Sequence, residues 1–495
     1  MSAAFEKPAR VFDRDREWRS LTDFVADDRA EPTLGIVSGR RRQGKTYLLR
    51  SLAEASGGFF FEAAEATETE SLRMLGAALA RHAGSGAAFS FASWDDALRY
   101  LSGLAADRPV PLVIDEFPYL LKSSPVLPSL IRQRIDEGQV VPGAPARLLL
   151  CGSAMTVMGG LLGGSAPLRG RAGLEMVVQP LAFRDAARFW GADDPGLAAR
   201  LHAIAGGTPA YRRQFVRDDV PSGLEDFDDW VVRAVLNPDR PLLREARYLL
   251  SEEMDVREPA LYYSVLGAIA VGKRTWGGIA SYIGRKSSDI AHPLQVLEDC
   301  KLVAKERDAF RGDRTSYRIT EPLIAFYEAV MRPRWSDLEL GLGADVWADA
   351  QHTFSAQILG PHFEELCREF GRREGSRTFG AVVGEVAAGT VSDPERKQQI
   401  QIDVAVLGPE RHDAPRRVIS IGECKWGETM GPRHLERLAR ARALLAVKGY
   451  DTDGALLACY GGGGFDAGLA DVAARRQDVL LISLDDLYRS PGGES

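Results

Sequence analysis

The chain has 495 residues, which is too long for one ordinary hydrophobic core and predicts two to four domains. Hydrophobic residues at 45% and charged residues at 26% are ordinary for globular proteins, and the net charge of -7 excludes an overall basic excess. The five cysteines are scattered and form no CxxC pair, which argues against a disulfide framework and a zinc site. We find no apolar signal segment and no apolar run of about 18 residues, and therefore expect a cytoplasmic protein without a membrane span.

Four regions follow one another along the chain. Residues 1–180 alternate short apolar runs with amphipathic stretches, which predicts an α/β fold whose parallel sheet is covered by helices. Residues 181–258 are helical in pattern and form a predicted helical lid. Residues 259–334 read as three helices and a hairpin, and residues 335–495 return to mixed strands and helices. The strands predicted in the first region are TLGIVSG, GFFFEA, VPLVIDE and ARLLLCGS.

The sequence GRRRQGKT fits the pattern G-x-x-x-x-G-K-[ST] of a phosphate-binding loop, and it lies between a predicted strand and a predicted helix. Glycines let backbone N–H groups curl around phosphate at a helix start that favours negative charge. Lys45 is expected to reach the β- and γ-phosphates of ATP, and Thr46 to bind Mg²⁺. The predicted nucleotide-binding residues of the loop are Gly39, Arg42, Gly44, Lys45 and Thr46.

A second signal of nucleotide hydrolysis follows. The apolar run VPLVIDE ends in Asp115, which can hold Mg²⁺ through water, and in Glu116, which can polarise the attacking water. The next strand ends in Ser153, which is placed to sense the γ-phosphate. In PLRGRAG, Arg169 or Arg171 is an arginine-finger candidate for a neighbouring subunit, which would require an oligomer; solvated arginines are the alternative.

Residues 259–334 have the pattern of a winged helix-turn-helix. Thr275 is expected to cap the second helix and Ser287 or Ser288 the third, and VAKERDAFRGDRTSYRIT reads as a two-stranded wing. Twelve Lys/Arg against eight Asp/Glu make residues 261–334 basic in an acidic chain, which suits contact with DNA phosphates. The candidate nucleic-acid contacts are Lys273, Arg274, Arg285, Lys286, Arg311 and Arg314.

One feature of this segment argues against base reading by the third helix. Pro293 lies inside it, and proline is tolerated in a first turn but kinks a helix further in. Winged helices also serve as protein–protein modules, so a packing or relay role stays open.

Near the C-terminal end, KQQIQIDVAVLG and RRVISIGECKW read as two strands. Period-two alternation predicts Ile400, Ile402, Val404 and Val406 on one face and Asp403 on the other. If the strands pair, Asp403 and Glu423 converge, and two converging carboxylates require a cation such as Mg²⁺ or Mn²⁺.

Lys425 would then lie beside the metal and orient a water or steady phosphorane charge. The preceding helix GPHFEELCREF adds Glu364 as a further metal ligand, with Glu365 as its rival. The pattern Asp403, Glu423-Cys424-Lys425 resembles the PD-(D/E)XK nucleases and implies a restriction-endonuclease-like α/β domain. Cys424 is expected to point away from the acids into the core.

The order of FDRDREW, GRRRQGKT, VIDE, CGSAM, PLRGR and GGTPAY resembles the archaeal-type ATPases, relatives of the AAA+ and signal-transduction P-loop ATPases. That resemblance implies that Arg14 and Glu17 lie near the nucleotide and that Pro209 packs against the base. It also implies a winged helix-turn-helix and a C-terminal nuclease-like region with GECKW. The aromatic stretch that often precedes the strand acid is replaced here by FGAVVGEVAAGTVSD.

Three functions are compatible with these motifs. The first is an ATP-controlled nuclease that cuts DNA, with a role in defence against foreign DNA by analogy of architecture. The second is an ATP-switched regulator that binds DNA or a protein partner without cutting it. The third is a scaffold role for a nuclease-like domain whose charges form salt bridges.

Overall fold

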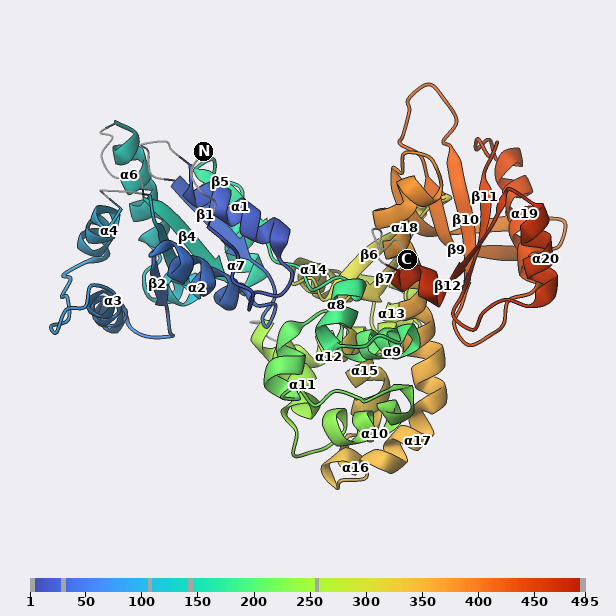
Figure 1. The fold of residues 1–495 in the computed structure, drawn as a ribbon, viewed down its shortest axis with the longest axis horizontal. Coiled ribbons are helices and arrows are strands. Elements are labelled where there is room, and N and C mark those ends of the chain that lie inside the picture. The colour runs from blue at the N-terminus through green and yellow to red at the C-terminus, as the bar shows by residue number, and fades with distance from the viewer. Residues whose placement is uncertain (1–4, 28–32, 106–108, 141–145, 254–257, 490–495) are drawn as a thin grey trace. The chain divides into compact units, whose positions relative to one another are not determined.

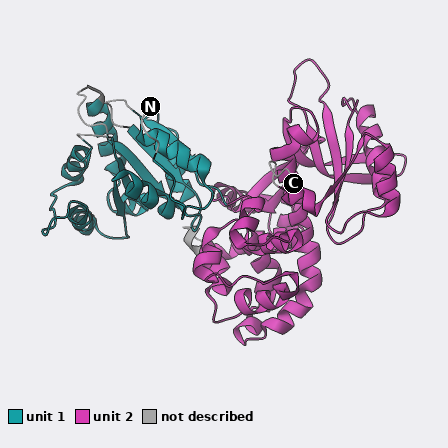
Figure 2. Ribbon diagram, in the orientation of Figure 1, with its two compact units in different colours: residues 1–180 teal, residues 181–495 magenta. Residues whose placement is uncertain are grey.

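The computed structural model describes residues 5–27, 33–105, 109–140, 146–253 and 258–489 (Figure 1). The chain separates into two compact units, Met1–Pro180 and Leu181–Ser495 (Figure 2). Among the described residues, no helix is both long and apolar enough to cross a membrane. All five cysteines are buried free thiols.

The first unit contains a parallel sheet, which within the described residues has five strands in the order β2-β3-β4-β1-β5. The four strands predicted from apolar runs are confirmed. The fifth was missed because AGLEMV interleaves a charge and glycine with its apolar residues at the sheet edge. The strands are β1 Thr33–Ser38, β2 Phe59–Glu62, β3 Pro111–Asp115, β4 Arg147–Gly152 and β5 Ala172–Val177.

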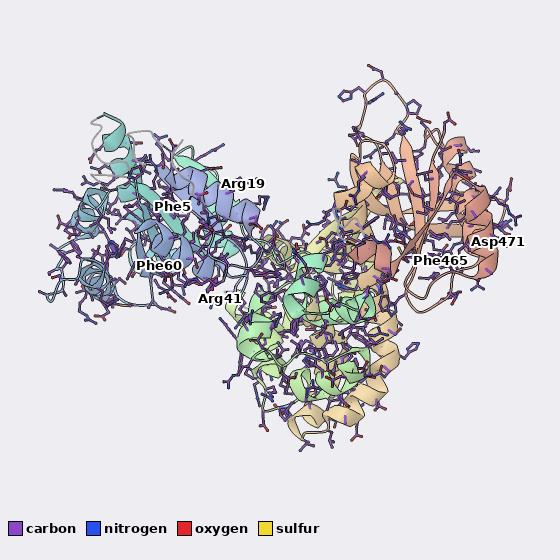
Figure 3. The ribbon with its side chains drawn as sticks, in the orientation of Figure 1. Phe5, Arg19, Arg41, Phe60, Phe465 and Asp471 are labelled. Atoms are coloured by element: carbon purple, nitrogen blue, oxygen red, sulfur yellow. The ribbon has the colours of Figure 1, made fainter. Side chains whose placement is uncertain are left out.

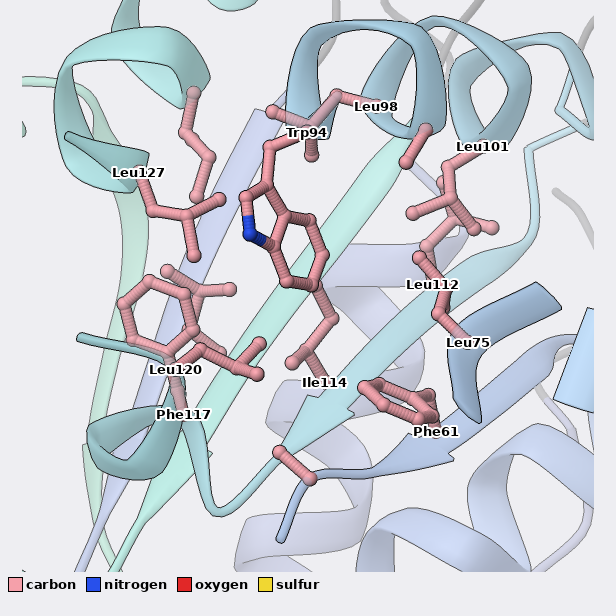
Figure 4. Packing of buried hydrophobic residues seen from close by; sticks show 14 of the residues in the cluster. Phe61, Leu75, Trp94, Leu98, Leu101, Leu112, Ile114, Phe117, Leu120 and Leu127 are labelled. Carbon is pink, nitrogen blue, oxygen red and sulfur yellow. The ribbon is translucent and has the colours of Figure 1, made fainter. Parts of the chain in front are cut away.

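Helices cover both faces of this sheet. Along β3, Leu112 and Ile114 pack into the cluster around Trp94 that Figure 4 shows, while Val113 packs into a second cluster with Leu49. This alternation buries both sides of the strand and explains its continuous apolar run. The helices are α1 Asp15–Val25, α2 Lys45–Ser56, α3 Glu68–His82, α4 Trp94–Gly103, α5 Phe117–Ser123, α6 Leu127–Val140 and α7 Met155–Gly160.

The second unit begins with a helical segment and continues into three helices and an antiparallel hairpin. Thr275 Oγ1 accepts a hydrogen bond from the Gly278 N–H at 3.2 Å and caps α13 as predicted. No side chain caps α14, because Ser287 and Ser288 lie in a preceding 3₁₀ turn. The elements are α8 Phe183–Trp190, α9 Pro195–Ala205, α10 Phe227–Trp230, α11 Pro241–Glu253, α12 Pro259–Ala270, α13 Trp276–Ile283, α14 Ala291–Asp299, β6 Val303–Asp308, β7 Arg311–Ile319 and α15 Pro322–Phe326.

Pro293 lies in the first turn of its helix. It is the third residue of α14, whose first turn has no intrahelical acceptor for its N–H groups. The proline is therefore compatible with a regular third helix, and the assignment of residues 259–334 as a winged helix stays a prediction.

A mixed sheet forms the C-terminal part of the second unit, and in the described residues its strand order is β12-β11-β10-β9-β8. Strands β8, β9 and β10 are antiparallel neighbours, whereas β10, β11 and β12 run parallel. The elements are α16 Trp335–Glu339, α17 Gly343–Thr353, α18 Gly360–Thr378, β8 Glu385–Asp393, β9 Gln398–Leu407, β10 Val418–Lys425, α19 Pro432–Val447, β11 Leu456–Gly461, α20 Ala467–Arg475, β12 Val479–Ser483 and α21 Leu484–Tyr488.

The predicted single apolar face of β9 is wrong. Ile400 and Ile402 pack into the cluster that contains α19, whereas Val404 and Val406 pack into the cluster that contains α18. The pairing with β8 shifts register by one residue between Ala387 and Gly389, so Asp403 and Val404 of β9 together face Ala388 and form a β-bulge. A bulge adds one residue and so exchanges the faces on either side of it.

Candidate functional site

The loop Gly39–Thr46 joins β1 to α2 at the carboxyl edge of the first sheet. Gly39 has φ +149°, and a Cβ there would lie 2.6 Å from the Val178 carbonyl oxygen, so only glycine fits. Gly44, at φ 88°, is the N-cap of α2. The loop therefore directs backbone N–H groups toward its centre at a helix start, where an anion is favoured.

Lys45 is folded into this loop. Its side chain is buried, and its Nζ donates to the carbonyl oxygens of Gly39 at 2.6 Å and Arg40 at 2.8 Å. Arg41, labelled in Figure 3, donates to the Tyr119 hydroxyl at 3.3 Å and ties the loop to α5. The ammonium group is thus held at the loop before any ligand arrives.

Asp115 ends β3 and carries an unusual oxygen. Its Oδ1 accepts a hydrogen bond from the Glu116 N–H at 3.0 Å. Its Oδ2 is buried without a hydrogen-bond partner, although the residue is only 1% exposed. A buried carboxylate oxygen without a partner is costly, and a cation or its water ligand removes that cost. Asp115 and the half-buried Thr46 therefore fit the needs of Mg²⁺, which prefers oxygen donors.

Glu116 follows in a strained conformation, with φ 51° at the start of α5. The Ser153 hydroxyl donates to its carboxylate, 3.3 Å from Oε2 and 3.4 Å from Oε1. Burial, with the neighbouring Asp115 charge, raises the pKa of Glu116. Ser153, predicted as a phosphate sensor, thus follows β4 and holds the carboxylate of Glu116, which follows the neighbouring strand β3.

The other residues predicted for the nucleotide site lie in different surroundings. Arg14 donates to the Gln43 carbonyl at 3.2 Å, so it lies against the phosphate-binding loop, and its guanidinium lies 3.6 Å from Glu17. Arg171 pairs with Asp136 of α6 at 2.6 Å within its own chain. Pro209 belongs to the second unit, so its proposed contact with the base stays a prediction.

The C-terminal acids lie at neighbouring positions of three elements. Gly422 of β10 pairs with Val404 of β9, which brings Glu423 beside Asp403. Asp403 Oδ2 accepts from the Cys424 N–H at 2.9 Å, and Oδ1 accepts from the Gln401 amide at 3.0 Å. The two strands pair, which is the condition for Asp403 and Glu423 to converge, and the bulge at Asp403 sets the direction of its side chain.

Glu364 of α18 faces the same group. Burial, with the nearby Asp403 charge, raises the pKa of Glu364 to about 7. Its rival Glu365 forms ion pairs with three arginines: Arg368 at 2.9 Å, Arg318 at 3.4 Å, and Arg372. Arg368 also donates to the Asp403 carbonyl at 3.0 Å. Of the two acids, Glu364 is therefore the better candidate for a functional residue, because it lies near Asp403 and has a raised pKa.

Glu423 has no exposed surface and is surrounded by cations. Lys425 Nζ lies 3.2 Å from its Oε1, and Arg437 of α19 donates from Nε to its Oε2 at 3.0 Å. Arg437 was not predicted, because it lies on a helix that no motif of the sequence links to the acids. Cys424 is buried among apolar side chains on the α18 side of the sheet.

These carboxylates do not fit a divalent metal as they stand. Within the described residues, no group of three or more histidine, cysteine, aspartate or glutamate side chains is arranged to hold a metal ion. Both oxygens of Asp403 and both oxygens of Glu423 already contact donors or cations of the chain. We therefore derive no chemical step through a metal at this site.

The hairpin β6–β7 packs on the C-terminal sheet. The Ala309 N–H donates to the Ala388 carbonyl at 2.9 Å, and Phe310 is buried with its ring 5.3 Å from that of Tyr450. Asp308 accepts from the Thr390 N–H at 3.1 Å. The hairpin is thus part of the C-terminal core as well as of residues 259–334.

The six candidate nucleic-acid contacts divide by position. Arg311 donates to Ser392 and Arg314 to Gln399, both on the C-terminal sheet. Burial lowers the pKa of Arg274, which lies near the charge of Glu364. The candidates left at the surface away from this sheet are Lys273, Arg285 and Lys286.

Helix α9 contacts the same C-terminal elements, which the sequence did not predict. The Arg200 guanidinium lies 5.4 Å from the ring centre of Trp426, directly after Lys425. His202 Nδ1 and His362 Nε2 are 2.9 Å apart, and burial lowers the pKa of both imidazoles. The helix that precedes Gly206 is therefore packed on the elements that carry Glu364 and Lys425.

Comparisons with known proteins show distant similarities, and no family model matches the chain. An uncharacterised protein of Methanocaldococcus jannaschii is 25% identical over 362 residues, which cover 72% of this chain and 76% of that protein. The Walker-type ATPase of Pyrococcus abyssi is 19% identical, with 64% of this chain and 96% of that chain covered and a TM-score of 0.49.

Two solved structures from Aeropyrum pernix are also similar. The ORC2 protein, in complexes with ADPNP and ADP, is 14% identical, with 70% of this chain and 99% of that chain covered and a TM-score of 0.41. The ORC1 protein in complex with DNA is 15% identical, with 67% and 95% covered and a TM-score of 0.28. Similarities this distant assign neither a family nor an activity to the chain.

Proposed function

We propose that the chain binds and hydrolyses ATP at the loop Gly39–Thr46. The observation that carries this proposal is Asp115 Oδ2, a buried carboxylate oxygen without a partner at the same sheet edge as the loop. Lys45 would exchange its two carbonyl contacts for phosphate oxygens. Thr46 and Asp115 would hold Mg²⁺, which supplies positive charge to those oxygens.

Glu116 is the proposed residue that orients the attacking water. Its carboxylate lies next to Asp115 and is fixed by Ser153, so it does not need to reorganise before reaction. Its raised pKa makes it a stronger base than an exposed glutamate. Ser153 would keep the carboxylate aimed at the water.

The test measures ATP affinity and phosphate release separately. We expect Lys45→Ala to lose ATP binding. We expect Glu116→Gln to bind ATP but to release phosphate at least about 100-fold more slowly than the wild type. Arg50→Ala is the matched control. Arg50 lies on the same helix as Lys45, but its guanidinium forms an ion pair of 2.8 Å with Glu62, outside the loop. Hydrolysis at the wild-type rate by the Glu116 variant would refute its assigned role.

A second candidate function is metal-dependent cleavage of nucleic acid at the C-terminal acids. It is favoured by Asp403 beside Glu423 at a β-bulge, with Lys425 two residues on and Glu364 facing them. Bulges often re-aim side chains next to active sites. The alternative is an ATP-switched regulator that binds DNA or a protein through residues 259–334, with the acids serving as a salt-bridge cluster.

A cleavage assay distinguishes the nuclease from the regulator. It uses single- and double-stranded DNA and RNA, with Mg²⁺ or Mn²⁺ and with or without ATP. The nuclease requires cleavage by the wild type that Asp403→Asn abolishes and the exposed-site control Glu395→Gln retains. An uncut substrate under every condition supports the regulator. Binding that weakens with salt would indicate phosphate contacts, for which Lys286 and Arg285 are the exposed candidates.

A further inference from the structure

Helix α19 sends one arginine to the C-terminal acids. Arg433, Arg437 and Arg440 lie on one side of the helix, but Arg433 pairs with Glu428 and Arg440 with Asp393. Only Arg437 reaches Glu423, through Nε to Oε2 at 3.0 Å and a second contact to Oε1. A fully buried glutamate thus receives part of its counter-charge from a residue of another element.

Glu423 needs that counter-charge because of its burial. A buried carboxylate that keeps its charge must be paired, and removing one partner leaves an uncompensated ion. Lys425 supplies one cation at 3.2 Å, and Arg437 supplies the other. A divalent ion beside Glu423 would provide the same compensation, so the ion and the guanidinium are alternative partners of one carboxylate.

We propose that Arg437 is the counter-cation of Glu423 in the metal-free protein and that it competes with a divalent cation for this carboxylate. The proposal rests on the second candidate function, since it concerns the same acids. It explains why these acids are close together and yet are not arranged to hold a metal ion.

Arg437, rather than Lys425, is the cation that gives way. Its side chain is 44% exposed and reaches Glu423 from a neighbouring helix, whereas Lys425 is 31% exposed and lies on the same strand two residues away. A half-exposed arginine can return its charged end to water at little cost. Arg433, one turn earlier on the helix, is 75% exposed and shows that this side of α19 is open to solvent.

The experiment is Mn²⁺ titration of the nucleotide-free full chain by calorimetry. We expect Arg437→Gln to bind Mn²⁺ about tenfold more tightly or better than the wild type, because a positive charge near the ligands is removed. Arg437→Lys keeps the charge and should stay near the wild type. Arg433→Gln is the matched control on the same helix and should not change affinity.

The double variant Arg437→Gln/Glu423→Gln assigns the site, because the gain must disappear with the carboxylate. Thermal melting of each variant confirms that it is folded. Affinity in folded Arg437→Gln no better than in the wild type would overturn the inference, while Asp403-dependent cleavage by the wild type would leave the second candidate function standing. Absence of both cleavage and Mn²⁺ binding in every variant would remove the inference and that function together.

Discussion

Asp115 and Glu423 are both buried carboxylates at the ends of central strands, and their surroundings differ. Asp115 Oδ2 and Glu423 Oε1 are both buried without a hydrogen-bond partner, but Glu423 Oε1 forms ion pairs with Lys425, at 3.2 Å, and with Arg437. The first arrangement is prepared for an ion, and the second is already neutralised. At the scale of single residues, the proposed nucleotide site therefore keeps an oxygen for an ion, whereas the C-terminal acids are paired with cations of the chain.

Residues within short motifs were predictable from the sequence. Lys45 and Thr46 follow from a loop spacing that the chemistry requires, and Asp115 follows from an apolar run that ends in an acid. His202 was not predictable because its partner His362 lies 160 residues away. Arg437 is only 14 residues from Glu423, but it lies on the next helix and outside the motif. Their surroundings depend on helix packing, for which a single sequence carries no signal.

The partly buried pair His202 and His362 predicts a pH dependence of stability. Burial lowers the pKa of His202 from 6.5 to about 4 in the folded chain. Its contribution is therefore fully present above pH 6.5 and is lost as pH falls toward 4, because the unfolded chain takes up the proton first. His202→Gln should reduce the loss of stability between pH 7 and pH 5 by about 2 kcal/mol relative to the wild type.

Urea unfolding of the wild type and the variant at both pH values measures this difference. Glu364 also has a shifted pKa and contributes to the pH dependence of both proteins. The result is therefore the difference between the wild type and His202→Gln in the stability lost from pH 7 to pH 5. His352→Gln, at an exposed histidine, is the control. Equal losses in the two proteins would show that His202 does not titrate as its burial requires.

At the scale of elements, the strands β9 and β10 were predicted with nearly correct bounds, but the faces of β9 were not. Alternation along IQIDVAV gives no sign that a bulge at Asp403 exchanges the faces. The docking of the hairpin was also hidden, because Phe310 occurs in a turn flanked by charges that reads as solvent-exposed. Both errors arise from tertiary pairing with β8.

Phe310 should contribute to the stability of the second unit. Its ring contacts Tyr450 and would be 2.5 Å from a Cβ placed on Gly389, so the pocket is closely packed. We expect Phe310→Ala to lower the free energy of unfolding by about 3 kcal/mol, through lost burial and a cavity. Chemical denaturation measures it, with the exposed hairpin residue Asp313→Ala as control. A loss below about 1 kcal/mol would show that the hairpin is not anchored.

At the scale of the whole molecule, the chain forms two compact units, and residues 181–258 belong to the second. Phe183 and Ala199 of this helical segment pack in one cluster with Phe363 and Tyr460. Arg184 adds a hydrogen bond to the Leu487 carbonyl at 2.6 Å. The sequence shows that these helices are amphipathic, but their partners lie more than 150 residues away and could not be inferred.

A fragment of residues 181–495 is therefore expected to fold by itself. It should unfold in a cooperative thermal transition, because its apolar clusters are complete without residues 1–180. A fragment of residues 259–495 is the matched comparison and should melt at a lower temperature, since it lacks Phe183 and Ala199. Aggregation of the longer fragment, or equal melting temperatures of the two, would contradict this division.

The anchoring of the hairpin has a consequence for any polymer gripped by residues 259–334. With Phe310 seated among Val391 and Ile400, the hairpin cannot swing independently of the sheet that carries Asp403. A nucleic-acid strand bound by Lys286 would then reach the acids at a constant distance from its point of contact. If the second candidate function holds, cleavage would leave fragments of uniform length measured from the bound point, which sequencing of the product ends would reveal.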